Sequence, residues 1–295
     1  MADLSLAAIM AVWGSSFAIL RSLLGGDAGS PLALVAVRMS VASALLLAWL
    51  VATPKGRADL ARIDRPLLRD GLLAGALLGV GFVFQTEGLQ RTTASRSGFL
   101  TGTLVVLVPL LEFLLFRKRP PLAALAGALV AFSGMALLSG PWGAVAQATV
   151  LGDWLTVACA VVFAGHIIFL GSVAARYPLL PLLLLQLATT AAIATLVGPL
   201  IESPHFSNGG KLWLAVGYLA LFATLLAFGI QTWAQKILPP VRVALLSALE
   251  PVFAAFWAAL LLGERMTGRE WLGGTLIVGG VLLGEAGAAL RARRA

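Results

Sequence analysis

Long apolar stretches, each of about 20 residues and bounded by short polar segments, recur from one end of this 295-residue chain to the other. A helix needs about 20 mostly apolar residues to cross the hydrocarbon core of a bilayer. Ten windows of this kind lie at Leu4–Leu24, Leu32–Thr53, Asp70–Gly88, Thr92–Phe116, Pro121–Gly140, Gly152–Ser172, Leu179–Ile201, Leu212–Ala234, Leu238–Leu262 and Gly268–Leu290. The pattern therefore predicts an all-α membrane protein with ten transmembrane helices.

The composition argues against a soluble or metal-dependent protein. Hydrophobic residues make up 60% of the chain and charged residues 12%, whereas soluble domains usually carry about 25% charged residues. With Cys159 as the sole cysteine and two histidines, no disulfide within the chain, no metal site and no cofactor are predicted. The net charge of +8 is dispersed between apolar stretches, so no nucleic-acid partner is predicted.

Basic residues between the spans predict the orientation. With the N-terminus placed in the cytoplasm, 14 of the 21 Lys and Arg residues fall in cytoplasmic segments and five in outer segments. The remaining two, Arg21 and Arg38, lie within spans. Because cytoplasmic loops of membrane proteins are enriched in Lys and Arg, both termini are predicted to be cytoplasmic.

The two halves of the chain align with each other. At a shift of 146 positions the matched pairs are Gln85 and Gln231, Thr86 and Thr232, Arg96 and Arg242, Thr101 and Ser247, Gly127 and Gly273, and Gly134 and Gly280. Near the start the shift is 150, which matches Asp3 with Asp153 and Trp13 with Phe163. Five spans per half is an odd number, so residues 149–295 are predicted to repeat residues 1–148 in inverted topology, as in many secondary transporters. The alternative is a chance alignment of apolar helices.

Several motifs, in order along the chain, resemble those of EamA-type carriers in the drug/metabolite transporter superfamily. Trp13-Gly14-Ser15-Ser16-Phe17 is similar to their W-G-x-x-F signature. Leu249-Glu250-Pro251-Val252-Phe253 with Gly263-Glu264, and then Trp271-Leu272-Gly273, resemble their last two helices. Arg38 resembles an arginine often present in their second helix. The first half departs from the pattern, because Arg117-Lys118 stands where the second half has Gly263-Glu264.

The resemblance implies a carrier of metabolites in the bacterial inner membrane. Its substrates would most often be amino acids and related compounds, and sometimes nucleosides or cationic drugs. It does not imply the use of ATP, and the chain contains no Walker-type phosphate loop.

Two ionisable residues in the spans are candidates for substrate or proton binding. Glu250 lies in the middle of the ninth predicted span beside Pro251, where an ionisable group is by default a functional hypothesis. It either binds a substrate amine or a proton, or holds helices together by hydrogen bonds. His166, in the sixth span, would suit proton coupling, or it is a neutral histidine bonded to a neighbouring helix.

Arg38 and Glu87 both fall towards the outer ends of their predicted spans, the second and the third. They could form an ion pair that closes the cavity in one state and parts in the other. The alternative is a permanent structural bridge, whose loss would leave a poorly solvated charge.

Amides and aromatic residues complete the predicted binding site. Gln85 and Gln231 could bind both the carboxylate and the amine of a zwitterion, while aromatic walls could contact an ammonium. The predicted substrate-binding residues are Trp13, Ser16, Phe17, Phe82, Gln85, Phe99, Thr101, Phe163, His166, Gln231, Trp233 and Glu250.

Taken together, these features predict a carrier that moves a small metabolite outward by alternating access, with amino acids, aromatic or otherwise apolar, as the favoured substrates. An exporter of cationic drugs or nucleosides is the alternative within this class. A channel and an intramembrane enzyme are alternatives of other classes, but the chain has no H-E-x-x-H motif and no paired aspartates in its spans. The glycine ridge at Gly71, Gly75 and Gly79 is explained by close helix packing, so no oligomeric state is predicted.

Overall fold

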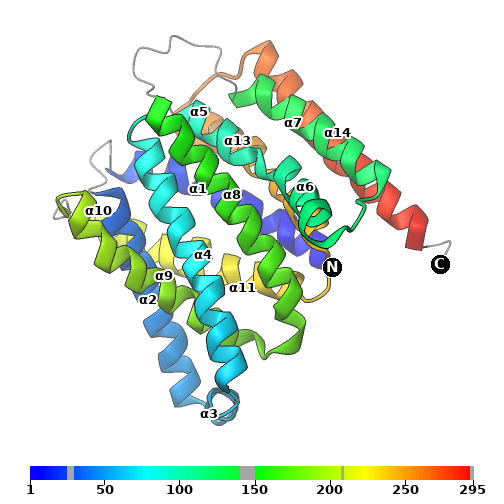
Figure 1. Ribbon diagram of the computed structural model, residues 1–295. Helices are drawn as coiled ribbons and strands as arrows, with labels where there is room; N and C mark the ends of the chain where they lie inside the picture. The colour runs from blue at the N-terminus through cyan, green and yellow to red at the C-terminus, as the bar shows by residue number, and fades with distance from the viewer. Residues whose placement is uncertain (25–29, 93, 140–149, 207–208, 293–295) are drawn as a thin grey trace.

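The computed structural model describes residues 1–24, 30–92, 94–139, 150–206 and 209–292, and all regular secondary structure within these ranges is helical (Figure 1). The elements are α1 (Ala2–Leu24), α2 (Pro31–Ala52), α3 (Pro54–Leu60), α4 (Arg65–Leu89), α5 (Ala94–Gly102), α6 (Leu104–Phe116), α7 (Leu122–Ser139), α8 (Val150–Val173), η1 (Ala174–Arg176), α9 (Leu179–Ile201), α10 (Gly210–Tyr218), η2 (Leu219–Leu226), α11 (Ala227–Ala234), α12 (Pro240–Ser247), α13 (Glu250–Leu262) and α14 (Gly268–Ala292).

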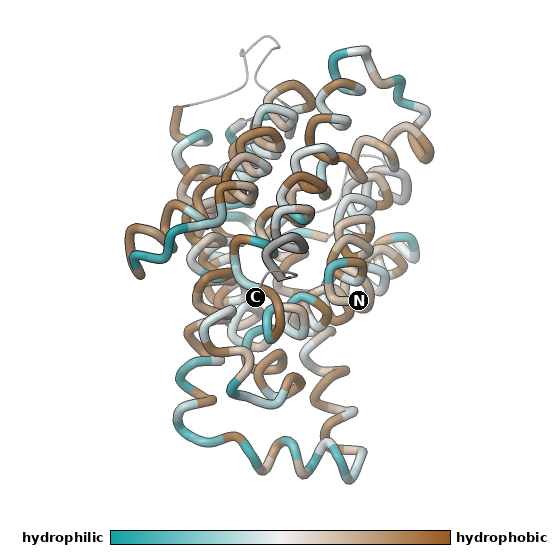
Figure 2. The backbone as a smooth tube through the Cα atoms, turned by 90° about the vertical axis from the view of Figure 1, so that its right-hand side faces the viewer, coloured by the Kyte–Doolittle hydropathy of each residue, from teal (hydrophilic) through white to brown (hydrophobic). Residues whose placement is uncertain are grey.

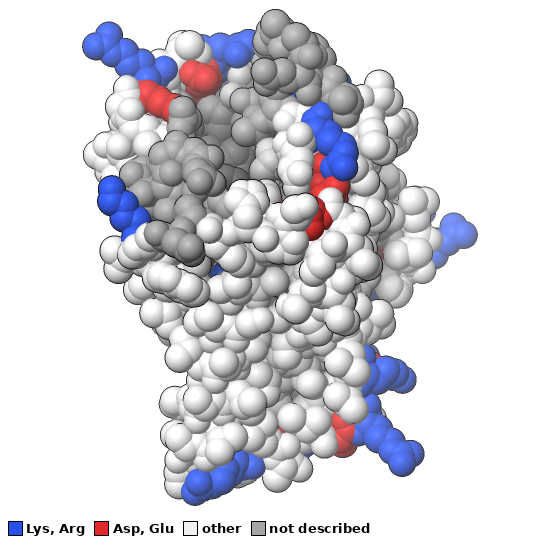
Figure 3. All heavy atoms as spheres, turned by 90° about the vertical axis from the view of Figure 1, so that its left-hand side faces the viewer, with Lys and Arg blue, Asp and Glu red and all other residues white. Residues whose placement is uncertain are grey.

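Eight helical segments in the described ranges are long and apolar enough to cross a membrane. Many of their large apolar side chains face outward; Leu196 is 72% exposed, Leu200 80% and Trp213 64%. Hydrophobic residues predominate along the helices in Figure 2, and Figure 3 shows a broad uncharged surface with charged side chains gathered above and below it. Since apolar surface of this extent is disfavoured in water, the chain is a multi-pass membrane protein.

Helices from the two halves of the chain pack against each other throughout the bundle. The pairs are α1 with α13, α2 with α9, α4 with α8 and α9, and α7 with α14 (Figure 1). The two largest of four hydrophobic clusters in the described ranges lie around α1, α6, α7, α12 and α14 and around α2, α4 and α9. Trp13 contacts both clusters, which places this part of α1 at the centre of the molecule.

Glycines allow these helices to approach closely. A Cβ atom on Gly14 would lie 2.7 Å from the backbone nitrogen of Ala254, where α1 crosses α13. Along α4, the ridge of Gly71, Gly75 and Gly79 packs on α9, and Thr190 Oγ1 donates to the Gly75 carbonyl at 3.1 Å. Small residues at such contacts let backbones pack without side chains between them.

The α7–α14 contact is made by the glycines that align in the two halves. A Cβ on Gly127 would lie 2.5 Å from the carbonyl oxygen of Gly280, and one on Gly134 would lie 2.6 Å from that of Gly273. The reciprocal approaches are equally close. Residues that match in sequence therefore meet, crosswise, in space.

Replacing Gly280 by valine is expected to destabilise the protein by about 2 kcal/mol, because the new side chain meets the α7 backbone, and overpacking typically costs 1–3 kcal/mol. Gly279 is a matched control, since it is the adjacent residue in α14 and a Cβ there meets nothing within 4 Å. Thermal unfolding in detergent should show a lower midpoint for Gly280→Val alone. Equal shifts in both variants would contradict the packing role.

Three predicted spans are interrupted rather than continuous. The fourth is divided into α5 and α6 and the ninth into α12 and α13, while the eighth contains the π-helical segment η2. The divisions match in the two halves, because α6 begins at Leu104 and α13 at Glu250, 146 positions later. Pro251 in the first turn of α13 explains why a helix restarts there. Both segments also end on a left-handed residue, Arg117 at φ 56° and Gly263 at φ 71°.

Candidate functional site

A pocket of about 180 Å3 lies at the centre of the molecule, and residues of both halves line it. It is lined by Trp13, Ser16, Arg38, Leu78, Phe82, Gln85, Thr101, Leu104, Phe163, His166, Ile167, Phe228, Gln231, Ser247 and Glu250. Both broken spans reach it at their interruptions, through Thr101 and Leu104 on one side and Ser247 and Glu250 on the other. Interrupted helices commonly form the substrate site of secondary transporters.

The structure brings most of the sequence-predicted site residues together in this pocket. They are Trp13, Ser16, Phe82, Gln85, Thr101, Phe163, His166, Gln231 and Glu250, joined by Arg38. Sequence reasoning did not name Leu78, Leu104, Ile167, Phe228 or Ser247 as site residues. Two of these residues could have been predicted from the sequence. Ser247 aligns with the predicted site residue Thr101, and Phe228 lies about one helical turn before the predicted site residue Gln231.

Polar groups without protein partners face the pocket. Glu250 makes no hydrogen bond or ion pair with the described residues. Gln231 is 5% exposed, and its Oε1 has no hydrogen-bond partner in the described part of the chain. Buried polar atoms are nearly always hydrogen-bonded, so these groups are suited to binding a polar ligand.

Aromatic rings form one wall of the pocket. The Phe82 centroid lies 5.5 Å from that of Phe163 and 6.3 Å from that of Phe228, both in edge-on geometry. Trp13 packs 5.3 Å from Phe228, and its Nε1 donates to the Ala223 carbonyl of η2 at 2.8 Å. A backbone carbonyl of the π-helical segment η2 thus accepts a hydrogen bond from the Trp13 indole, and this bond holds the indole beside the pocket.

His166 is tied to its neighbouring helix. Its Nε2 lies 3.1 Å from Oε1 of Gln186 on α9, and the Gln186 amide in turn lies 3.4 Å from the Thr232 hydroxyl. His166 is 2% exposed. The hydrogen bond to α9 is the one expected of a structural histidine, although the ring also borders the pocket.

Arg38 and Glu87 are not joined in this conformation. Glu87 pairs with Arg91 one turn later in the same region of the chain. The guanidinium carbon of Arg38 lies 4.9 Å from the centroid of the Phe82 ring, inside the pocket. The expected pair is absent because Arg91 is within one helical turn of Glu87 and Arg38 points to the pocket instead.

The other predicted site residues lie elsewhere. Phe99 stacks on Phe132 of α7 with centroids 5.3 Å apart, and Trp233 packs against the cluster around α1 and α12. Neither lines the pocket. The side chain of Phe17 lies outside the described part of the structure.

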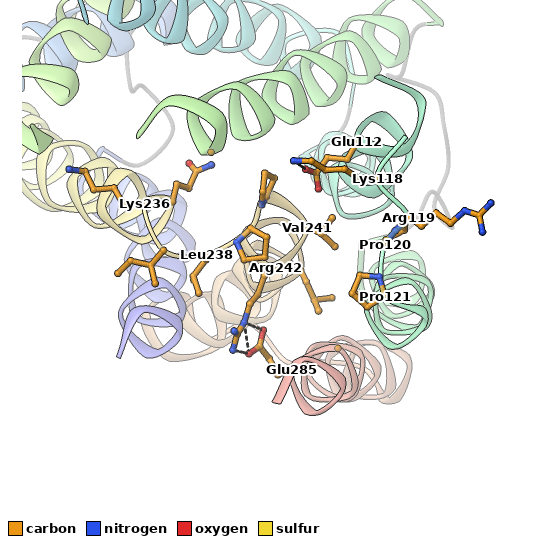
Figure 4. A pocket seen from close by; sticks show the side chains of 18 residues that line it. Glu112, Lys118, Arg119, Pro120, Pro121, Lys236, Leu238, Val241, Arg242 and Glu285 are labelled. Carbon is orange, nitrogen blue, oxygen red and sulfur yellow. Dashed lines mark hydrogen bonds and ion pairs between the residues drawn. The ribbon is translucent and has the colours of Figure 1, made fainter. Parts of the chain in front are cut away.

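A second, larger cavity of about 560 Å3 opens at one end of the bundle (Figure 4). Charged residues border it, among them Glu112, Lys118, Lys236, Arg242 and Glu285. Figure 4 shows the side chains of Arg242 and Glu285 pointing toward each other, with Arg242 Nε 2.8 Å from Glu285 Oε1. Burial, and then the charge of Arg62, lower the pKa of Lys236, whose Nζ donates to the Tyr177 carbonyl at 2.7 Å.

Two ion pairs join residues that match between the two halves. Arg242 Nε lies 2.9 Å from Asp3 Oδ1, joining α12 to the first turn of α1. Arg96 binds Asp153 through two bonds of 2.7 and 2.6 Å, joining α5 to the first turn of α8. Each pair thus links a half-helix of a broken span to the N-terminus of a long helix, where a carboxylate is favoured.

The two pairs lie at opposite ends of the bundle. A Cβ on Gly171, near the C-terminus of α8, would lie 2.8 Å from Pro240, which begins the helix that carries Arg242. Asp153 precedes Gly171 by 18 positions on the same helix, a distance of about 27 Å at 1.5 Å per residue. This separation is close to the roughly 30 Å thickness of a bilayer core.

Comparisons with known proteins agree with this architecture. The model of the EamA-like transporter family matches residues 1–140 and 150–284. A protein of Archaeoglobus fulgidus named as an uncharacterized transporter is 31% identical over 285 residues, which cover 96% of this chain and 85% of that protein. The inner membrane transporter YedA of Escherichia coli, also named as uncharacterized, is 28% identical over 292 residues, with 95% and 89% covered. A solved crystal structure shares the fold, with a TM-score of 0.81 at 24% identity over 96% of both chains.

Proposed function

The chain belongs to the EamA-like transporter family, and we propose that it exports amino acids, aromatic or otherwise apolar, across the bacterial inner membrane. The observation that carries this proposal is the central pocket, where one carboxylate and two amides face an aromatic wall. Its volume is about 180 Å3. Pockets that bind drug-sized molecules usually measure about 300–1,000 Å3, so this pocket suits a smaller ligand. The predicted site residues that line this pocket enter the proposal as the residues that contact the substrate.

The proposed topology has ten transmembrane helices in two inverted halves, residues 1–148 and 149–295, with both termini in the cytoplasm. The matched interruptions of the fourth and ninth spans support it. So do the crosswise contacts of Gly127 with Gly280 and of Gly134 with Gly273. The bias of basic residues supports the orientation.

Alternating access would use the two matched ion pairs as opposed latches. In this topology, Arg242 with Asp3 and Glu285 lies at the cytoplasmic end, and Arg96 with Asp153 at the outer end. Each arginine sits on a short half-helix beyond an interruption, which allows the half-helix to move without displacing the rest of its span. Opening one pair while the other stays closed would expose the pocket to one side at a time.

Counterflow in proteoliposomes tests the substrate class. Vesicles are preloaded with a mixture of unlabelled amino acids, and labelled leucine and phenylalanine are added outside in turn. Saturable accumulation that falls at least about fivefold in Gln85→Ala is expected, because that amide lines the pocket. Absence of accumulation for every amino acid, with folded and inserted protein, would overturn this substrate class and leave cationic drugs and nucleosides as candidates.

The same assay separates the other classes. A channel would show unsaturable flux with no counterflow, and an intramembrane enzyme would change the compound chemically.

Proton coupling is a further proposal, motivated by Glu250 and His166. Equal uptake at every imposed pH gradient, with saturating substrate, would rule it out.

A further inference from the structure

Within the part of the chain that the structure describes, Arg38 is a cation of the central pocket without an ion-pair partner. It extends from α2, and its only described partner is the ring of Phe82, over which the guanidinium lies at 4.9 Å. Several arginines near helix ends do have carboxylate partners: Arg69 pairs with Asp70, and Arg96 with Asp153. A charged side chain inside a membrane protein normally pairs with another or marks a substrate path. Because no carboxylate of the described residues pairs with Arg38, its guanidinium is a candidate group for binding an anionic part of the substrate.

The geometry of the guanidinium fits a carboxylate. Arg carries five N–H donors in a planar fork that matches the two oxygens of a carboxylate. The guanidinium carbon lies 4.9 Å from the centroid of the Phe82 ring, and a contact with an aromatic ring does not use up the N–H donors of the fork. The ring thus holds the cation in place and leaves its hydrogen-bonding edge for another group.

The opposite charge in the same pocket is also unpaired. Glu250 has no ion-pair or hydrogen-bond partner among the described residues, and Arg38 and Glu250 do not bond each other. Gln231 Oε1 adds one buried acceptor without a hydrogen-bond partner in the described part of the chain. Among the described residues, this pocket of about 180 Å3 thus holds one cation and one anion without ion-pair partners and one free acceptor, which match the charge pattern of a small zwitterion.

We infer that Arg38 binds the α-carboxylate of the substrate, while Glu250 and Oε1 of Gln231 bind its ammonium group. This inference rests on the proposed function and extends it, because it assigns an orientation and a selectivity. Molecules with an α-carboxylate and an α-ammonium satisfy both charges. Amines, amino amides and simple carboxylates each leave one buried charge without a partner, which is costly.

A competition assay tests this assignment. Counterflow of labelled leucine is inhibited with unlabelled leucine, with leucinamide, which lacks the carboxylate, and with 4-methylpentanoate, which lacks the ammonium. Wild-type protein is expected to prefer leucine over leucinamide at least about thirtyfold. In Arg38→Gln this preference should fall at least about tenfold, mostly through weaker leucine binding, while the affinity for leucinamide changes little. The same series built on phenylalanine checks a larger side chain.

Two further variants separate binding from folding. Arg38→Lys keeps the charge but loses the fork, so an intermediate preference is expected. Arg69→Gln removes an exposed arginine outside the pocket and should leave the preference unchanged. An unchanged preference in Arg38→Gln with retained transport would overturn the inference, and so would an Arg38→Lys protein that folds and discriminates no differently from Arg38→Gln.

A binding measurement distinguishes this failure from failure of the proposed function. Purified wild-type and Arg38 variants are heated with 4-methylpentanoate or with leucinamide, and the unfolding midpoint is recorded. If amino-acid counterflow fails but the carboxylate stabilises wild type and not Arg38→Gln, Arg38 is an anion site and the substrate class is wrong. If counterflow succeeds but neither selectivity nor stabilisation depends on Arg38, the function stands and the inference is wrong.

Discussion

Replacing Glu250 by glutamine is expected to lower amino-acid counterflow about a hundredfold. A hydrogen bond to a charged group contributes about 1.5–3 kcal/mol, and each 1.36 kcal/mol corresponds to a factor of ten, so loss of one charged contact to the ammonium gives a factor of roughly 10 to 150. The isosteric amide keeps the size of the side chain, and therefore isolates its charge. Initial rates and half-saturation concentrations in proteoliposomes measure the effect.

Glu270 provides a control for this substitution. It lies on α14 outside the pocket, is half-buried and accepts a hydrogen bond from Thr267 at the start of that helix, so Glu270→Gln should transport at the wild-type rate. Glu250→Asp should retain part of the activity, because the charge remains but is set back by one methylene. Wild-type kinetics in Glu250→Gln would show that the carboxylate only holds helices together.

Hydropathy was sufficient to predict the helical membrane fold, because bilayer thickness sets the length of an apolar segment directly. It could not predict the interruptions of the fourth, eighth and ninth spans. A broken helix and a continuous one bury the same apolar residues, so their sequences have similar hydropathy. Pro251 was the one local signal of a break; at Thr103, between α5 and α6, the sequence has no comparable residue.

The internal repeat carried most of the information about the pocket. Gln85 and Gln231, or Thr101 and Ser247, match in sequence, and matched positions in an inverted repeat approach the same axis. All four residues line one cavity, although the members of each pair are 146 positions apart, and this is the arrangement that the proposed inverted repeat predicts. Their role in substrate binding stays a prediction.

The facing of individual side chains was harder to predict. Phe99 was expected in the pocket but stacks on Phe132 instead, because helix rotation is set by packing that a single sequence does not reveal. Likewise, depth alone suggested a pair between Arg38 and Glu87, whereas the competing partner Arg91 lies only four positions from Glu87. The depth of a residue in the membrane follows from its position along the span. The direction in which its side chain points depends on how the helix is rotated about its axis, and this rotation is set by packing against neighbouring helices.

Breaking the two matched ion pairs is expected to shift the accessibility of the pocket in opposite directions. Asp153→Asn removes the carboxylate at the proposed outer end, and Asp3→Asn with Glu285→Gln removes both carboxylates around Arg242. A partly buried charged contact of about 1.5 kcal/mol or more would change the ratio of outward-open to inward-open protein about tenfold.

Cysteine labelling measures this shift. The sole native cysteine, Cys159, is buried, and can be replaced by alanine before a reporter cysteine is placed at Ser16 in the pocket. A membrane-impermeant maleimide is added to oriented vesicles from either side. Asp153→Asn should raise labelling from the outside about tenfold and reduce it from the inside, and the variant lacking the two carboxylates around Arg242 should do the reverse.

A charge-exchange variant distinguishes an ion pair that controls access to the pocket (a latch) from one that only stabilises the fold (a brace). In Arg96→Asp with Asp153→Arg the pair is reversed but can re-form, so labelling should return toward the wild-type ratio even if the arginine is less favoured at the N-terminus of α8. A brace that only stabilises the fold would lower the unfolding midpoint in every variant without changing the side from which Ser16→Cys reacts. Labelling that rises from the same side in both broken variants would contradict the opposed latches, because two pairs related by an inverted repeat can govern alternate access only if their loss has opposite effects.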